Sequence, residues 1–150
     1  MNHITQIMRI DCDQKLLLAF YRSTYRVLKP GFDLHPGKDN PSFQSWCKSE
    51  DIHSWTFITA WNPSAQKSDK NRNLAANREM ESELKGRGYR YFRGIGIPEE
   101  GEDWEAEESF FVANMDLKNS LTMAKKFGQK AFLYGMPDMR PSLIWVDSRL

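Results

Sequence analysis

The sequence at residues 55–61 reads Trp-Thr-Phe-Ile-Thr-Ala-Trp and is followed at once by Asn62-Pro63. This run is apolar, aromatic and β-branched without interruption, and it has the length of a strand. Such a run is typical of a strand that is buried on both faces, so it predicts a central strand of a sheet. Proline cannot donate to a strand ladder, so the strand is expected to end at Asn62-Pro63.

The segments before this strand predict two helices and a strand pair. Asp13 is expected to cap a helix over 14–22, and Asn40 with Pro41 begins a second helix. Between them, 24–28 and 32–35 have the composition of short strands, joined by the turn residues Lys29-Pro30-Gly31.

The segments after the strand alternate between helices and strands. A helix over 71–85 ends near Gly86 and Gly88, and Asp116 caps another helix, whose predicted buried stripe is Leu117, Leu121 and Ala124. Strands are predicted at 89–97, 107–115, 131–134 and 143–146. The strands 89–97 and 107–115 should pair as an antiparallel hairpin with an acidic loop at its tip.

These elements predict an α+β fold: one domain over residues 1–150, with a mixed, mostly antiparallel sheet and helices packed on it. Residues 1–11 are a candidate flexible N-terminal segment. With 40% hydrophobic residues and 150 residues in all, the chain can bury a single core without disulfides or metals.

Composition argues against several classes of protein. Only Cys12 and Cys47 are present, which indicates reduced thiols in a cytoplasmic protein. The cysteines and His3, His35 and His53 lack the spacing of metal ligands, so we expect no metal and no cofactor. No apolar run approaches the roughly 20 residues that span a bilayer, and the start of the sequence is not a signal peptide, so no membrane association is expected.

The segment 85–93, Lys-Gly-Arg-Gly-Tyr-Arg-Tyr-Phe-Arg, interleaves basic and aromatic side chains, as RNA-binding strands do. Seven acidic residues follow within 99–108, and cross-strand pairing with them would neutralise the basic strand. The net charge of +1 gives no further support for nucleic-acid binding. We therefore expect no strong nucleic-acid binding, and a weak module of this kind remains an alternative.

The helix over 71–85 carries an unusual polar pattern. Asn73, Asn77, Met80 and Leu84 share one face, so both amides are expected to point inward with the apolar side chains. Asparagine is a poor helix former, so two of them on a buried stripe need a reason. They either satisfy irregular backbone after Asn62-Pro63 or recognise the donors and acceptors of a ligand.

Other polar side chains are expected near these amides. Glu107 and Ser109 share one face of their strand, and Gln129 follows a helix end. Buried amides and carboxylates are costly when unpaired, so the group forms either a closed structural lock or a cleft for a ligand. The candidate ligand-binding residues are Asn62, Ser64, Asn73, Asn77, Glu107, Ser109 and Gln129.

Four motifs together resemble one family, the domain of unknown function numbered three-two-nine-three, which occurs in bacteria, cyanobacteria and some phages. The motifs are Phe57–Pro63, Asn73 with Asn77, Trp104 with Glu107, Ser109 and Phe110, and Phe127-Gly128-Gln129 with Ala131. Order and spacing agree from about Tyr21 to Val146. Glu108 departs from the family, which often has proline there. The resemblance implies one compact cytosolic domain and carries no activity.

The function expected from the sequence is a small-molecule-binding or regulatory module with a polar cleft, whose partner is an unknown small molecule or a protein. The first alternative is an enzyme that uses Glu107 as acid or base on a small metabolite. The second is the weak nucleic-acid module described above. The sequence shows no nucleophile paired with a base, so no catalytic residue is assigned.

Overall fold

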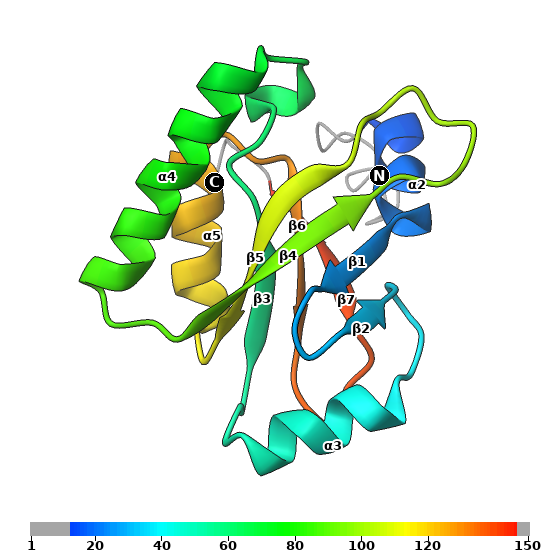
Figure 1. Ribbon diagram of the computed structural model, residues 1–150. Coiled ribbons are helices and arrows are strands. Elements are labelled where there is room, and N and C mark those ends of the chain that lie inside the picture. The colour runs from blue at the N-terminus through cyan, green and yellow to red at the C-terminus, as the bar shows by residue number, and fades with distance from the viewer. Residues whose placement is uncertain (1–12, 147–150) are drawn as a thin grey trace, which may run out of the picture.

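The computed structural model describes residues 13–146 (Figure 1). The predictions made for residues 1–11, His3 and Cys12 lie outside the described residues. Within the described part, no helix combines the length and hydrophobicity that crossing a membrane requires.

The described chain forms four α-helices and one seven-stranded sheet. The helices are α2 Gln14–Arg22, α3 Pro41–Ser49, α4 Lys70–Gly86 and α5 Leu117–Lys126, with a 3₁₀ turn at Pro63–Ala65. The strands are β1 Thr24–Val27, β2 Phe32–Leu34, β3 Trp55–Ile58, β4 Tyr91–Ile97, β5 Glu107–Ala113, β6 Ala131–Gly135 and β7 Ser142–Trp145. Asp13, Asn40, Asp69 and Asp116 each cap a helix through the side chain.

The strand order is β2-β1-β4-β5-β3-β6-β7, and every described pairing is antiparallel. The unit β3-α4-β4-β5-α5-β6 occupies the middle in the order β4-β5-β3-β6. In this unit each helix connects two strands that have a third strand between them, which is the split β-α-β arrangement of ferredoxin-like folds. The β1–β2 hairpin extends one edge of this unit and β7 extends the other. The predicted α+β fold is confirmed.

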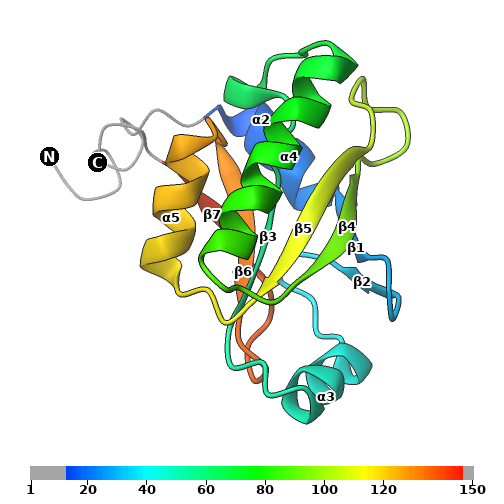
Figure 2. The same cartoon turned by 60° about the vertical axis from the view of Figure 1, so that its left-hand side comes forward.

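Helices cover both faces of the sheet (Figures 1 and 2). Helices α4 and α5 lie side by side on one face, where Met80, Leu84 and Met123 pack against alternate residues of the central strands. On the other face, α3 packs through Phe43 and Cys47. Helix α2 lies at the opposite end from α3 (Figure 1), where Phe20 contacts Trp145 with 6.5 Å between ring centroids. The sheet between α2 and α3 carries the site described below.

The prediction of a central strand is confirmed, because β3 pairs with β5 on one side and β6 on the other. The strand is shorter than predicted and ends at Ile58 rather than Trp61. From Ala60 onward the backbone N–H groups bond to side chains instead of a neighbouring strand, as detailed below.

The predicted hairpin is also confirmed: β4 and β5 pair antiparallel with Gly96 opposite Glu107, and the acidic loop joins them. One predicted buried residue is wrong, since Leu117 is 38% exposed. The stripe of α5 that faces the sheet instead contains Ser120, Met123 and Ala124. Ser120 can be buried there because its hydroxyl shares a hydrogen bond of 2.6 Å with Thr56 of β3.

Candidate functional site

The irregular segment after β3 is held by the two inward asparagines of α4. Asn77 Oδ1 accepts the N–H of Ala60 at 2.9 Å, and Asn73 Oδ1 accepts the N–H of Asn62 at 2.8 Å. Asn73 Nδ2 in turn donates to Asn62 Oδ1 at 2.9 Å. These side chains are buried, so the amides replace the strand ladder that ends at Ile58.

The same amides tie α4 to the start of β5. Asn77 Nδ2 donates to the carbonyl oxygen of Glu108 at 2.8 Å, and the Thr59 hydroxyl donates to that same oxygen at 2.6 Å. Asn73 and Asn77 therefore form a closed lock between α4, the end of β3 and the start of β5. On this side of the sheet, the contacts of the polar cluster therefore hold segments of the chain together.

The backbone that follows is strained. Asn62, Ser64 and Ala65 have φ values of 47°, 60° and 56°, a left-handed conformation that non-glycine residues rarely adopt. Ser64 N–H donates to the carbonyl oxygen of Gly128 at 2.7 Å, which fastens the turn to the end of α5. Backbone strain of this kind persists only when surrounding contacts hold it, and it concentrates at functional sites.

Glu107 begins β5 on the opposite face from the asparagine lock. Its cross-strand neighbour is Gly96, and Tyr25 of β1 lies opposite Gly96 in turn. Because Gly96 has no side chain, a gap is left in this row between Tyr25 and Glu107. A Cβ at Gly96 would lie 3.9 Å from Ser109 Oγ and from the carbonyl oxygen of Glu107, an ordinary contact distance.

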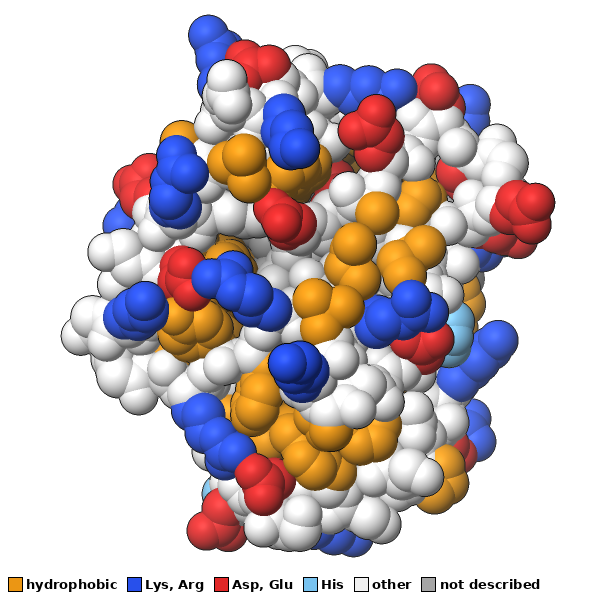
Figure 3. All heavy atoms as spheres, in the orientation of Figure 1, with side chains coloured by type: hydrophobic (Ala, Val, Ile, Leu, Met, Phe, Trp, Pro, Cys, Tyr) orange, Lys and Arg blue, Asp and Glu red, His pale blue; other side chains and the backbone are white. Residues whose placement is uncertain are grey.

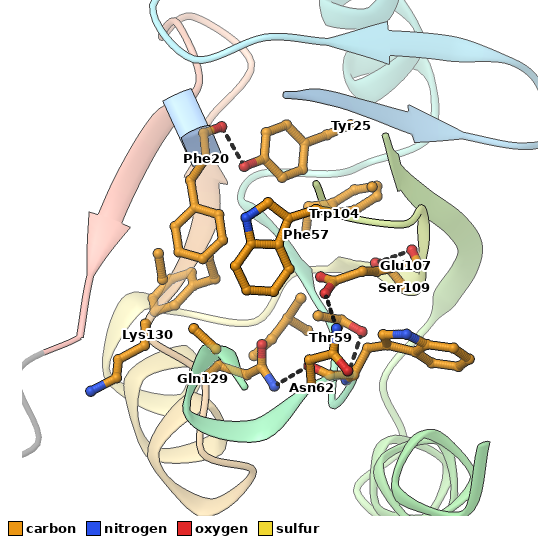
Figure 4. A pocket seen from close by; sticks show the side chains of 16 residues that line it. Phe20, Tyr25, Phe57, Thr59, Asn62, Trp104, Glu107, Ser109, Gln129 and Lys130 are labelled. Atoms are coloured by element: carbon orange, nitrogen blue, oxygen red, sulfur yellow. Dashed lines mark hydrogen bonds between the residues drawn. The ribbon is translucent and has the colours of Figure 1, made fainter. Parts of the chain in front are cut away.

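The gap is part of a cavity lined by aromatic and polar side chains (Figure 4). About 50 Å³ is open to water-sized groups, and a neighbouring chamber of the same size shares several of its walls. The walls that both chambers share are Phe20, Tyr25, Gly96, Trp104 and Glu107. At roughly 10–15 Å³ for each water, either chamber holds a few waters or a small chemical group.

Burial raises the pKa of Glu107 to about 7. The hydrogen bond that Asn62 Nδ2 donates to Glu107 Oε2 at 3.2 Å opposes this rise. Among the described lysines and arginines, none forms an ion pair with Glu107. Burial, followed by the charge of Glu107, also raises the pKa of Tyr25. Glu107 is thus a carboxyl group whose protonation changes near neutral pH.

The remaining predicted site residues lie around this cavity in different ways. Ser109 lines the cavity, and its hydroxyl donates to the carbonyl oxygen of Glu107 at 2.9 Å. Gln129 also lines it, with Nε2 donating to the Trp61 carbonyl oxygen at 3.1 Å. Asn62 reaches both the lock and Glu107. Asn77 and Asn73 line two separate hollows on the α4 side, of about 260 and 430 Å³ respectively. Ser64 is exposed outside the cavity.

The cavity-lining residues that the sequence did not assign to the site include Phe20, Tyr25, Phe57, Gly96 and Trp104. A partial signal for Gly96 was present, because the predicted hairpin places the end of strand 89–97 beside the start of strand 107–115. Trp104 was noticed only as part of a family motif. Phe20 and Tyr25 had no signal at the level of the sequence, since only the strand order brings β1 next to β4.

The basic strand is paired with acids, but no described ion pair joins it to the acidic residues of 99–108, so the predicted cross-strand neutralisation is wrong. Arg87 contacts Glu83 at 3.0 Å and Arg93 contacts Glu81 at 2.8 Å, both on α4, while Arg90 pairs with Glu50. On the face shown in Figure 3, lysines and arginines are interspersed with acidic and apolar side chains and form no continuous band. Among residues 13–146, no three acidic, histidine or cysteine side chains are grouped as metal ligands would be.

The family described as "Protein of unknown function (DUF3293)" matches residues 58–132. The chain belongs to this family. No curated protein and no solved structure matches it. The DUF3293 match is narrower than the resemblance seen in the sequence, and runs from the end of β3 into β6.

The DUF3293 segment contains the asparagine lock, the strained turn, Trp104, Glu107 and Gln129. Phe20 and Tyr25 precede it. The cavity therefore combines polar groups and Trp104 from the DUF3293 segment with the rings of Phe20, Tyr25 and Phe57, which precede that segment.

Proposed function

We propose that this protein is a small-molecule-binding module and that the cavity at Glu107 is its binding site. The observation that carries the proposal is a half-buried carboxyl group that forms no ion pair with a described basic residue and is aimed into a cavity (Figure 4). A buried charge is normally paired, because an unpaired one is costly to desolvate. A ligand that supplies the missing partner would remove this cost.

The contacts around the cavity support a preformed site. Asn62 is fixed by Asn73 and by Ser68, whose N–H donates to Asn62 Oδ1 at 3.0 Å. Gln129 is fixed by the carbonyl oxygens of Trp61 and Phe127. Polar groups whose positions are held by other hydrogen bonds are typical of binding sites, since little order is lost when a ligand arrives.

The proposal is tested by ligand-observed NMR with a library of fragments, comparing the wild type with Gly96→Leu. The leucine side chain would project into the cavity from a position where the first carbon fits without a clash. Fragments that bind the wild type should lose binding to Gly96→Leu. Gly86→Ala, on the far end of α4 with no atom within 4 Å of the added carbon, serves as the control. Equal binding to all three proteins would contradict the proposal.

A second candidate function is an enzyme with Glu107 as general acid or base. The observation that favours it is the pKa of about 7, which suits proton transfer near neutral pH. A nucleophile or a second titratable group in contact with the bound molecule would still be needed. Turnover of a bound fragment that is lost in Glu107→Gln, while the fragment still binds, would distinguish the enzyme from a binding module.

A further inference from the structure

Four of the aromatic rings that line the cavity come from separate parts of the chain. They are Phe20 of α2, Tyr25 of β1, Phe57 of β3 and Trp104 of the β4–β5 loop, and we call them the aromatic cage. Tyr25 and Phe57 meet edge to face with 5.4 Å between their centroids. Figure 4 shows the rings gathered around one space, with the Glu107 carboxylate directed toward it.

The polar atoms at this space include the indole N–H of Trp104, which is a donor, and several acceptors. Glu107 presents its carboxylate, and the one proton of the Tyr25 hydroxyl is donated to the Phe20 carbonyl oxygen at 2.7 Å. Gln129 uses its Nε2 on two carbonyl oxygens, which leaves the side-chain oxygen on the cavity side in Figure 4. A site made of π faces and lone pairs attracts positive charge.

The charged groups nearby do not satisfy Glu107. Lys130 lines the cavity, but its amine points away from the aromatic cage in Figure 4. Glu105 lines the neighbouring chamber and adds negative charge. Tyr25 faces Glu107 from β1 and is neutral at physiological pH, since its pKa is raised.

We propose that the aromatic cage and Glu107 bind the head group of a small protonated amine. This inference rests on the proposed function, because it assumes that the cavity is a ligand site. The ammonium group would donate to Glu107 and lie against the ring faces, while the rest of the molecule extends through the opening of the cavity. A chamber of about 50 Å³ suits a primary alkylammonium head of a few non-hydrogen atoms.

Other ligand classes fit these walls less well. An anion would meet the Glu107 carboxylate without a basic group to balance it. A neutral alcohol could donate a hydrogen bond to the carboxylate but would bring no positive charge to balance it. A protonated amine removes that cost and adds a cation–π contact with each ring that it touches.

The experiment compares three probes of equal length: n-butylamine, n-butanol and sodium butyrate. Binding is followed by NMR on the indole N–H of Trp104 and the side-chain amide of Gln129, at a pH above the value of about 7 that Glu107 has. We expect butylamine to bind most tightly. In Glu107→Gln, its affinity should fall by about tenfold or more, the usual value of a hydrogen bond to a charged group. In Glu108→Gln, which removes an exposed carboxylate next in sequence, affinity should be unchanged.

A second readout is the titration of Glu107 itself. An ammonium group stabilises the ionised carboxylate, so saturating butylamine should lower the pKa of Glu107 from about 7, as followed by the carboxyl ¹³C shift. If butanol or butyrate binds at the cavity as tightly as butylamine, the amine proposal is wrong while the small-molecule site stands. If none of the probes binds and no fragment binds either, both proposals are wrong.

Discussion

Replacing Glu107 by Gln should stabilise the free protein at neutral and alkaline pH. The pKa of Glu107 rises from 4.5, the value expected in the unfolded chain, to about 7 in the folded protein. Below 4.5 the carboxyl is protonated in both states and makes no difference to stability. Between 4.5 and 7 the unfolded chain loses the proton while the folded protein keeps it, so stability falls as pH rises. Above pH 7 the carboxyl is ionised in both states, and the full cost of its burial lowers the stability of the folded protein.

The size of this cost follows from the difference in pKa. About 2.5 pH units at about 1.4 kcal/mol per unit give an upper value of about 3.5 kcal/mol. Judged by its exposed surface, Glu107 is only half-buried, and the cavity admits water. Both reduce the cost of ionisation, so we expect the free energy of unfolding to rise by about 1–3 kcal/mol in Glu107→Gln. The glutamine oxygen can still accept the hydrogen bond from Asn62.

The assay is urea unfolding of the wild type and Glu107→Gln at several pH values from below 4.5 to above 7. The difference in unfolding free energy should be near zero at the acidic end and largest at the alkaline end. Glu108→Gln removes the same charge from an exposed position and should change stability within about 0.5 kcal/mol at every pH. A Glu107→Gln protein that is less stable than the wild type above pH 7 would refute the account of Glu107 as an unpaired buried carboxyl.

Two further predictions concern stability. Asn77→Ala leaves the buried N–H of Ala60 without its acceptor and should lower the free energy of unfolding by about 1–3 kcal/mol. Asn71→Ala, on the exposed side of α4, should be nearly neutral. Equal effects of the two substitutions in chemical denaturation would argue against the lock. Gly135→Ala places a carbon 2.5 Å from the ring of Trp55 and should lower the free energy of unfolding by about 1–3 kcal/mol. In Gly86→Ala the added carbon meets nothing within 4 Å, so this control should be neutral or slightly stabilising. An unchanged melting temperature in Gly135→Ala would show that the Trp55 ring can move.

Much of the fold followed from local rules in the sequence. Asp13, Asn40 and Asp116 cap helices where the sequence placed them, because capping needs only a side chain and an N–H three residues away. The central strand followed from its apolar composition. Its early end did not, because the amides that take over its hydrogen bonding belong to a helix that follows in the chain.

The candidate site was predicted less completely. Period-two alternation placed Glu107 and Ser109 on one face, and helical periodicity placed Asn73 and Asn77 inward. Neither rule says on which face of the sheet the Glu107–Ser109 pair or the Asn73–Asn77 pair lies. The aromatic cage depends on packing across four separate segments, and such contacts are fixed by strand order rather than by any local pattern.

The polar cluster that the sequence predicted as either a lock or a cleft has two halves with different contacts. On the α4 side the amides of Asn73 and Asn77 bond to backbone groups and to the side-chain oxygen of Asn62, which is how a lock is built. On the other side Glu107 is held by a single described hydrogen bond and opens onto a cavity. Asn62 belongs to both, since its backbone and side-chain oxygen are fixed by the lock while its Nδ2 contacts Glu107. Buried amides in α4 therefore serve the cavity by fixing Asn62, although they do not touch it.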